Sequence, residues 1–379
     1  MSRTVYLHIG IAKTGTTYLQ RRLFENRELL RDHGVLYPGQ GPAAHFLGSL
    51  DLRGTAFKGH EYPGKAGAWD RLVAAADQFD GTTLISHETL ARAKHEHIER
   101  AVGGFATDDV RIVISVRDLA RQIPATWQET LKNRSATRYD DYLADVFATW
   151  PAASRPARGF WAAQDIGELV GRWSAVVGAD RITVVTVPPR GADRNELWRR
   201  FALATDLPDL EYRSGEETAN SSLGVAEAEV LRRLNPLLTD VLDWPGYDAL
   251  VKRRLAENIL GPLDSHGRLT LPAAWTEQAR EIAAAQIGYL ESSGVEVVGD
   301  FRDLEPLPVV TDAAQPDDLS DSELLDAALG ALARLAAVPP PTGAPPPPRR
   351  LPGSARASQL AGSAGRGVKR LVGRLSPHG

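Results

Sequence analysis

Short runs of aliphatic and β-branched residues alternate with helical stretches over the first half of the chain. These runs predict five strands, at Val5 to Ile9, Val35 to Tyr37, Thr82 to Ser86, Val110 to Val116 and Ile182 to Val187. Nearly continuous apolar runs are typical of strands that are buried on both faces of a parallel sheet. Because helices separate them, the fold class predicted is α/β, a parallel sheet flanked by helices.

Helical periodicity follows the first strand and dominates the later part of the chain. Leu19, Leu23 and Leu30 share one face of a helix that ends at His33-Gly34, a cation followed by a glycine. Apolar residues also recur at helical spacing in two later stretches, Val225 to Leu238 and Thr276 to Ser293. The later part is therefore predicted to be helical.

Composition divides the chain into three regions. Residues 1–300 carry the α/β pattern, and 301–338 form an acidic segment and a helix that begins at the capping box of Ser320 and Glu323. Residues 339–379 are rich in proline and basic residues, and are expected to be a disordered tail. Its last apolar and basic stretch, Val368 to Leu375, is compatible with a weak contact to a membrane surface or a partner.

Overall composition is that of a globular protein, with 43% hydrophobic and 24% charged residues. The chain has no cysteine, which excludes disulfides, cysteine-ligated metals and a thiol nucleophile. The net charge is −4, but residues 338–379 hold seven basic residues and no acidic ones, which leaves −11 on residues 1–337. The chain has 7 lysines and 37 arginines, and the arginines are interspersed with acids, so no nucleic-acid partner is expected.

No apolar run approaches the roughly 20 residues that a membrane-spanning helix needs. The N-terminus enters a strand without the basic and apolar regions of a signal peptide. A cytoplasmic protein without a transmembrane segment is the resulting prediction.

The loop after the first strand has the composition of an anion-binding site. A strand, a Gly/Thr-rich turn and a helix present backbone N–H groups and the positive end of a helix dipole to a ligand. A nucleoside triphosphatase loop places its lysine directly after the second glycine, whereas here Thr16 stands there and the lysine lies inward at Lys13. Lysine in this place suits an oxygen on which charge develops during group transfer.

The segment His8 to Gln20 resembles the 5′-phosphosulfate-binding loop of sulfotransferases that use 3′-phosphoadenosine 5′-phosphosulfate (PAPS). The resemblance implies a P-loop-like fold and no metal cofactor. It also implies that Lys13 approaches the oxygen between sulfate and 5′-phosphate. The implied donor-binding residues of this loop are Ala12, Lys13, Thr14, Gly15, Thr16 and Thr17.

A second anion site is expected about a hundred residues later. Arg117 ends a strand, where ligands of doubly wound sheets bind, and it matches the family arginine that binds the 3′-phosphate. The family serine eight residues further on is replaced by Ala125, and Thr126 is the nearest hydroxyl. A shift of one position rotates a helical side chain by about 100°. Arg121 is an alternative phosphate ligand, or a surface arginine paired with Asp118 or Glu129.

The residues after the third strand are candidates for a general base. Glu88 and His87 follow Thr82 to Ser86, and Glu88 resembles the glutamate of carbohydrate-type family members. The alternative is that His87 caps a helix and Glu88 lies in its first turn. His45 and His60, in a Gly/Pro-rich region, are further candidates for acceptor binding.

Two other patterns carry less weight. The spacing of His95 and His97 puts them on opposite sides of a helix, so no metal site is expected. Asn220 to Leu223 is either a loop over the nucleotide or a helix N-cap.

Three functions stay open on the sequence. A sulfotransferase that transfers sulfuryl from PAPS to a hydroxyl or amine of a carbohydrate, glycolipid or small metabolite fits best. A P-loop kinase or nucleotide hydrolase is disfavoured by the displaced lysine. A catalytically silent nucleotide-binding scaffold gains weight if Glu88 and His87 face away from the Lys13 loop.

Overall fold

A six-stranded parallel sheet forms the centre of the N-terminal part of the protein. The structure is a computed structural model that describes residues 3–150, 159–213, 222–263, 265–307 and 313–337. The strands are ordered β2-β3-β1-β4-β5-β6 across the sheet, and every neighbouring pair is parallel. Their bounds are Thr4–His8 (β1), Val35–Leu36 (β2), Thr82–Ser86 (β3), Val110–Val116 (β4), Ile182–Thr186 (β5) and Glu296–Val298 (β6).

The predicted α/β fold class is confirmed, and the five predicted strands are present within one residue of their expected ends. The sixth strand, β6, was not predicted. It has three residues and only Val298 is buried, so it lacks the long apolar run that marks the other strands.

Helices connect the strands and form most of the C-terminal half. Those of the N-terminal half are α1 (Thr16–Glu25), α2 (Arg27–Asp32), α3 (Ala44–Leu52), α4 (Ala68–Asp77), α5 (His95–Gly103), α6 (Leu119–Lys132), α7 (Tyr139–Ala148), α8 (Ile166–Val177) and α9 (Glu196–Ala204). The later ones are α10 (Val225–Leu238), α11 (Trp244–Tyr247), α12 (Thr276–Ser293), α13 (Asp321–Ala337) and the π-helix η4 (Asp248–Leu260). Short 3-10 turns occur at η1 (Glu88–Arg92), η2 (Trp161–Ala163), η3 (Ala179–Arg181), η5 (Ala273–Trp275), η6 (Phe301–Leu304) and η7 (Pro316–Asp318).

Helices cover both faces of the sheet. Because side chains alternate along a strand, Val5 and Leu7 of β1 face one helix layer and Tyr6 faces the other. The first layer contains α4, α5 and α8, and the second contains α1, α2 and α9. This double cover explains why the strands read as continuous apolar runs.

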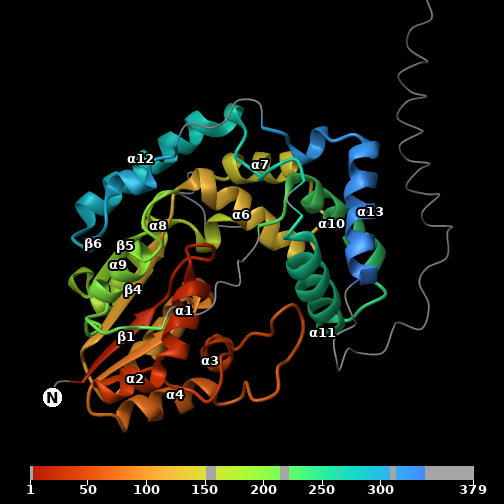
Figure 1. The fold of residues 1–379 in the computed structure, drawn as a ribbon. Coiled ribbons are helices and arrows are strands. Elements are labelled where there is room, and N and C mark those ends of the chain that lie inside the picture. The colour runs from red at the N-terminus through yellow and green to blue at the C-terminus, as the bar shows by residue number, and fades with distance from the viewer. Residues whose placement is uncertain (1–2, 151–158, 214–221, 264, 308–312, 338–379) are drawn as a thin grey trace, which may run out of the picture.

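A third hydrophobic core lies among the later helices. Trp127 of α6, Tyr139 of α7 and Tyr247 of α11 are fully buried there, packed with residues of α10 and η4. Helix α6 leaves the end of β4 and runs into this helical group, as Figure 1 shows. The start of α6 therefore lies at the sheet edge and its last turns lie against the helical group.

The predicted first helix is two helices in the structure. Asn26 separates α1 from α2, and its side chain donates to the carbonyl of Arg22 at 2.8 Å and accepts from the amide of Arg213 at 2.9 Å. The leucine pattern continues across the break and so conceals it. The predicted helix α12 has the expected bounds, with Gly294 in a left-handed conformation at its end. The capping box of Ser320 and Glu323 is formed, and α13 ends at Ala337.

Some predictions fall outside the described residues. They are the tail, 339–379, and the first two residues of the Asn220 to Leu223 loop. None of the helices that the structure describes is both long and apolar enough to cross a membrane.

Candidate functional site

The loop between β1 and α1 lies at the carboxyl edge of the sheet, in the middle of its strand order. Lys13 has φ 71° and Gly15 has φ 85°, both in the left-handed region. A side chain on Gly15 would also meet Cδ2 of Leu197 at 2.5 Å, so the position requires glycine. Gly15 is the N-cap of α1 and offers no side chain, so no side chain from the described residues caps the first-turn amides. Those amides are suited to bind an anion.

The threonines of the loop divide into two groups. The hydroxyl and amide of Thr14 both donate to the carbonyl of Ile11, at 2.6 and 3.3 Å, and its side chain is buried. Thr14 therefore holds the turn of the loop, and its hydroxyl proton is already donated within the protein. Thr16 is buried at the start of α1 and Thr17 is exposed.

Lys13 forms an ion pair that the sequence analysis did not anticipate. Its Nζ donates to Oε2 of Glu129 on α6 at 2.6 Å, and Nζ of Lys252 on η4 donates to Oε1 of the same carboxylate at 2.9 Å. Burial alone would raise the pKa of Glu129, but the two ammonium groups hold it well below its usual range. Glu129 is therefore an anion held between two lysines.

Arg117 lies directly beside this loop. It follows the last residue of β4, and its guanidinium donates to the carbonyl of Lys13 at 3.0 Å. Burial and the nearby charge of Arg121 lower its pKa to about 10, so Arg117 is still a cation near neutral pH. The Nε of Arg117 is buried and has no hydrogen-bond partner among the described residues. A buried donor of this kind is available to a ligand.

Thr126, the other candidate for the 3′-phosphate, lies on α6 two turns after Arg117. Its hydroxyl donates to the carbonyl of Gln122 at 2.9 Å. The side-chain amide of Gln122 donates to the carbonyl of Ala12 and, at 2.8 Å, to Oε1 of Gln164. The Thr126 hydroxyl proton is thus already donated to a backbone carbonyl of its own helix. The Gln122 side chain, in contrast, connects α6 to the glycine loop through the carbonyl of Ala12. Gln122 has no counterpart in the motif used for the prediction.

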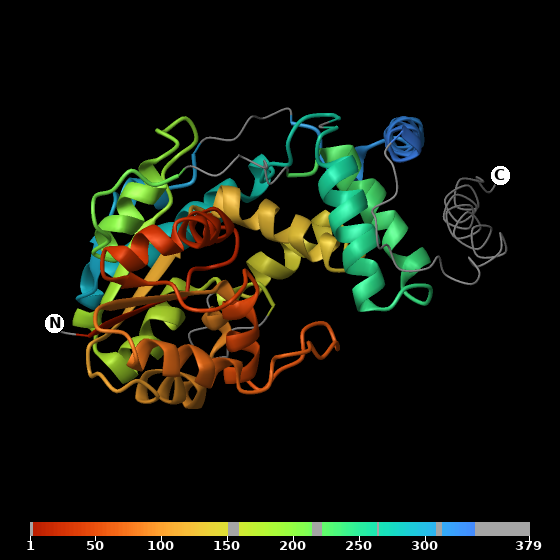
Figure 2. The same cartoon turned by 60° about the horizontal axis from the view of Figure 1, so that its bottom comes forward.

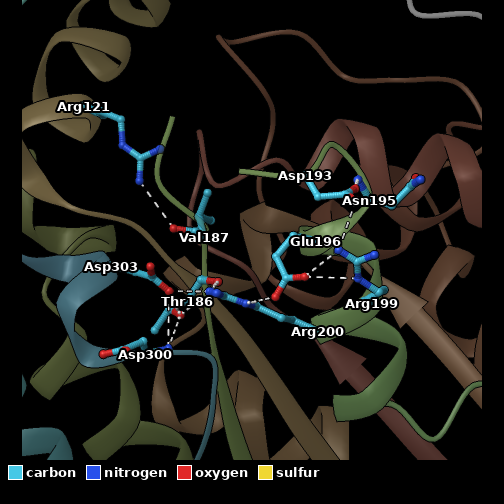
Figure 3. Close-up of polar contacts among 10 residues, drawn as sticks. All are labelled: Arg121, Thr186, Val187, Asp193, Asn195, Glu196, Arg199, Arg200, Asp300 and Asp303. Atoms are coloured by element: carbon cyan, nitrogen blue, oxygen red, sulfur yellow. Dashed lines mark hydrogen bonds and ion pairs between the residues drawn. The ribbon is translucent and has the colours of Figure 1, made fainter. Parts of the chain in front are cut away.

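Arg121 is held by protein groups. It pairs with Asp118, the N-cap of α6, and donates to the carbonyls of Pro188 at 2.9 Å and Val187 at 3.3 Å. Figure 3 shows its contact with Val187, which follows β5. The pairing with Asp118 is one that the sequence analysis considered, but the Arg121 side chain is largely buried and is not a surface group. Its contacts with Pro188 and Val187 join α6 to the residues after β5.

A buried polar network joins β5 to α9 and η6, close to the contact between Arg121 and Val187 (Figure 3). Arg200 donates to the carbonyl of Thr186 at 3.0 Å and pairs with Asp303. The hydroxyl of Thr186 donates to Asp303 at 2.7 Å, and a Cβ on Gly299 would lie 2.0 Å from that hydroxyl. These contacts hold β6 and η6 in place and do not involve the glycine loop.

Glu88 lies on the other side of the glycine loop, after β3. Its Oε2 accepts from Nε2 of Gln20 on α1 at 3.1 Å, and the same Gln20 amide donates to the carbonyl of Ser86 at 3.3 Å. Burial would raise the pKa of Glu88, but the charge of His87 and the hydrogen bonds it accepts lower it. The carboxylate is therefore ionised near neutral pH. Its side chain is 29% exposed, and it is hydrogen-bonded to α1, the helix that begins at the glycine loop.

His87 has a structural contact in addition to its proposed role. It is the N-cap of η1, and its Nδ1 accepts from the amide of Thr89 at 3.2 Å. Its ring packs on Phe46, with ring centres 5.3 Å apart. This is the capping arrangement considered in the sequence analysis, with Glu88 in the first turn.

His8 supports the floor of the site from the end of β1. Its Nδ1 lies 2.7 Å from Oγ of Ser86 on β3, and its Nε2 lies 2.8 Å from Oγ of Ser115 on β4. Burial lowers the pKa of His8 to about 4. The neutral ring therefore joins the ends of three adjacent strands, from which Lys13, Glu88 and Arg117 follow.

His45 does not lie in an open loop, as the sequence analysis expected. It is buried on α3, where Nε2 donates to the carbonyl of Pro38 at 2.7 Å and Nδ1 accepts from the amide of Ser86 at 3.1 Å. Both ring nitrogens are used, so His45 supports the end of β3. His60 is half-buried and its ring packs on Tyr62. Among the residues described, no group of three or more His, Cys, Asp or Glu is placed to hold a metal ion.

Comparison with solved structures finds a crystal structure of a sulfotransferase from Alicyclobacillus acidocaldarius. The match covers 68% of this chain and 98% of that chain, with 18% sequence identity and a TM-score of 0.37. No family model matches the chain. No curated protein matches it either.

Proposed function

We propose that the protein is a PAPS-dependent sulfotransferase that transfers a sulfuryl group to a hydroxyl or amine of a carbohydrate, glycolipid or small metabolite. The observation that carries the proposal is the contact between Arg117 and the carbonyl of Lys13. It brings two groups suited to phosphate and sulfate to adjacent positions at one sheet edge. A donor with a 5′-phosphosulfate and a 3′-phosphate needs two such groups.

The strand order supports the proposal because β3, β1 and β4 are neighbours. Their carboxyl ends carry Glu88, the Lys13 loop and Arg117, in that order. Ligands of open parallel sheets bind at this edge. The carboxylate proposed as base therefore lies on one side of the loop, and the arginine proposed for the 3′-phosphate lies on the other.

Lys13, Glu88 and His87 each have one role in the proposed reaction. The acceptor oxygen or nitrogen attacks sulfur, the bond from sulfur to the bridging oxygen breaks, and 3′-phosphoadenosine 5′-phosphate leaves with the electron pair. Lys13 neutralises the charge that develops on the bridging oxygen. Glu88 takes the acceptor proton, a role that its ionised state permits. His87, 3.9 Å from Glu88, is proposed to assist this carboxylate.

Calorimetric titration of the full chain with 3′-phosphoadenosine 5′-phosphate, and separately with ATP and Mg²⁺, tests the proposal. Wild type and Arg117→Ala are compared. Thr126→Val is the matched control, because the Thr126 hydroxyl already donates its proton to the carbonyl of Gln122. We expect metal-independent binding of the bisphosphate, weakened at least about 30-fold by Arg117→Ala.

Thr126→Val is expected to change the affinity little. Preference for ATP with Mg²⁺ would replace the proposal with a kinase or hydrolase. Absence of binding to either ligand would favour a silent scaffold.

A further inference from the structure

Lysines gather at one place in a chain that otherwise uses arginine. The sequence has 7 lysines and 37 arginines. Of the six lysines that the structure describes, four lie around Glu129, and we name them the lysine cluster: Lys13, Lys58, Lys132 and Lys252. The remaining two, Lys65 and Lys94, pair with Glu61 and Glu96.

Lys132 is the member that most needs a partner. It lies in the last turn of α6 and is 8% exposed. Its ammonium forms no hydrogen bond or ion pair with another described residue, although the charges of Lys13, Glu129, Glu257 and Lys252 act on it. Burial and the charge of Lys13 lower its pKa. Burial of the lysine disfavours its charged form, and an anionic ligand in contact with the ammonium would offset that cost.

Lys252 and Lys58 reach Glu129 from two other elements. Lys252 lies on η4, which has π-helical hydrogen bonding, a rare arrangement, over Asp248–Leu260. Its ammonium also donates to Oδ1 of Asn133 at 3.2 Å. Lys58 lies on the loop between α3 and α4, exposed and with φ 53°. The charges of Lys252 and Glu129 reach its ammonium.

The loop that carries Lys58 is anchored to the helical group. Phe57 packs on Trp244 of α11 with ring centres 5.5 Å apart, and the Trp244 indole donates to the hydroxyl of Tyr62 at 2.9 Å. Figures 1 and 2 show this loop reaching from α3 towards α11 and η4. Lys58 is therefore held on the same side of the molecule as Lys252.

The lysine cluster lies beyond Lys13 as seen from Arg117. Arg117 precedes the start of α6, whereas Glu129 and Lys132 lie near its end, about 15 to 20 Å along the helix axis from its first residue. Lys13 lies between them, in contact with Arg117 through its carbonyl and with Glu129 through its ammonium. The donor is proposed to lie between Lys13 and Arg117, so the other three lysines lie on the side that is left for the acceptor.

We propose that the acceptor is an anion, and that Lys58, Lys132 and Lys252 bind an oxyanionic group, a carboxylate or a sulfate ester, carried by it. The inference rests on the proposed function for the identity of the ligand as acceptor. Positive charge here is concentrated in a chain whose first 337 residues carry −11. Three ammonium groups from separate elements can contact one such group from three directions. A neutral sugar or phenol offers nothing to neutralise them.

The test uses the full chain saturated with 3′-phosphoadenosine 5′-phosphate, so that the donor site is filled. Sucrose octasulfate is titrated as the sulfate probe and trigalacturonate as the carboxylate probe. Sucrose and maltotriose are their neutral counterparts. Lys58→Gln/Lys252→Gln is compared with Lys94→Gln/Arg280→Gln, which removes the same charge from two exposed side chains that pair with Glu96 and Glu277. A third variant, Lys369→Gln/Arg370→Gln/Arg374→Gln, controls for the basic C-terminus.

We expect at least one anionic probe to bind, and its neutral counterpart not to bind. Lys58→Gln/Lys252→Gln should weaken that binding at least about tenfold, and the two control variants less than about twofold. The preferred probe distinguishes carboxylate from sulfate.

Equal effects of all three variants, or no binding of either anion, would overturn the proposal. So would a loss of bisphosphate affinity in Lys58→Gln/Lys252→Gln well above tenfold, because that is more than the loss of the Lys252 contact with Glu129 can cause through Lys13, and the lysines would then belong to the donor site. If the bisphosphate does not bind wild type at all, the proposed function fails. Lysine-dependent binding of the probe to the free protein would then still identify an anion site.

Discussion

The ammonium of Lys13 lies 2.6 Å from a carboxylate oxygen of Glu129, the residue that also holds Lys252. The lysine proposed to stabilise the leaving group is thus already neutralised by a protein anion. A donor that brings a phosphosulfate to the loop has to compete with Glu129 for this ammonium. Donor affinity and the Lys13 ion pair are therefore coupled.

Glu129→Gln tests this coupling. Removing the negative charge should tighten binding of 3′-phosphoadenosine 5′-phosphate about 3- to 10-fold, because Lys13 no longer has a competing partner. Calorimetry gives the affinity, and thermal unfolding of the same samples checks that the lysines around position 129 are still accommodated. Weaker binding in a folded variant would show that Glu129 positions Lys13 for the donor.

Lys13→Ala should reduce turnover far more than donor affinity. The interaction of the ammonium with the bridging oxygen grows as the sulfur–oxygen bond breaks, so its loss should lower kcat about 10²- to 10³-fold. The affinity for the bisphosphate should change less than about tenfold. Steady-state kinetics with an identified acceptor and calorimetry measure the two quantities. Equal losses in both would contradict the role assigned to Lys13.

Glu88→Gln tests the proposed base while keeping the contact with Gln20. The amide oxygen can still accept from the Gln20 side chain, so the local structure is retained. It cannot take a proton, and kcat should fall about 10²-fold or more. Gln20→Ala is the matched control, because it removes the hydrogen bond and leaves the carboxylate. A variant Glu88→Gln with normal turnover would exclude Glu88 as the base.

His8 should make folding stability depend on pH. Burial lowers the pKa of His8 from its ordinary 6.5 to about 4, so the unfolded chain binds a proton that the folded protein rejects between these values. The stabilisation is present above pH 6.5 and is lost as the pH falls towards 4. Between pH 7 and pH 5, protonation of His8 should therefore lower the free energy of unfolding by about 2 kcal/mol.

Urea unfolding of wild type and His8→Gln at pH 7 and pH 5 measures this contribution. The variant should lose about 2 kcal/mol less than wild type over that interval. His45→Gln should behave in the same direction, because burial also lowers the pKa of His45 to about 4. An identical pH dependence in wild type and His8→Gln would contradict the prediction.

The sheet could be predicted from sequence because most of its strands are buried on both faces. Ile112, Val113 and Ile114 of β4 are all fully buried, and such a run has few alternatives. The weak edge strand β6 has no run of this kind. The break at Asn26 depends on a contact with Arg213, which is distant in the sequence, so the leucine spacing around it could not report it.

The candidate site was predictable only where a local motif carries it. Lys13 and Gly15 belong to a recognisable loop, and Arg117 directly follows strand β4. Glu129 and Lys252 meet Lys13 through tertiary packing of α6 and η4, which no local pattern records. The scarcity of lysine in the sequence was one available signal that the few lysines present have a particular role. Thr126 was chosen by its spacing from Arg117, but the spacing does not show that its proton is already donated to Gln122.

The backbone of Lys13 has a further consequence for the evolution of the loop. With φ 71°, this residue adopts a conformation that costs an L-residue with a Cβ about 1 kcal/mol and costs glycine almost nothing. Selection for stability alone would favour glycine at position 13. The lysine at this position gives up that stability, and the turn carries an ammonium group in exchange.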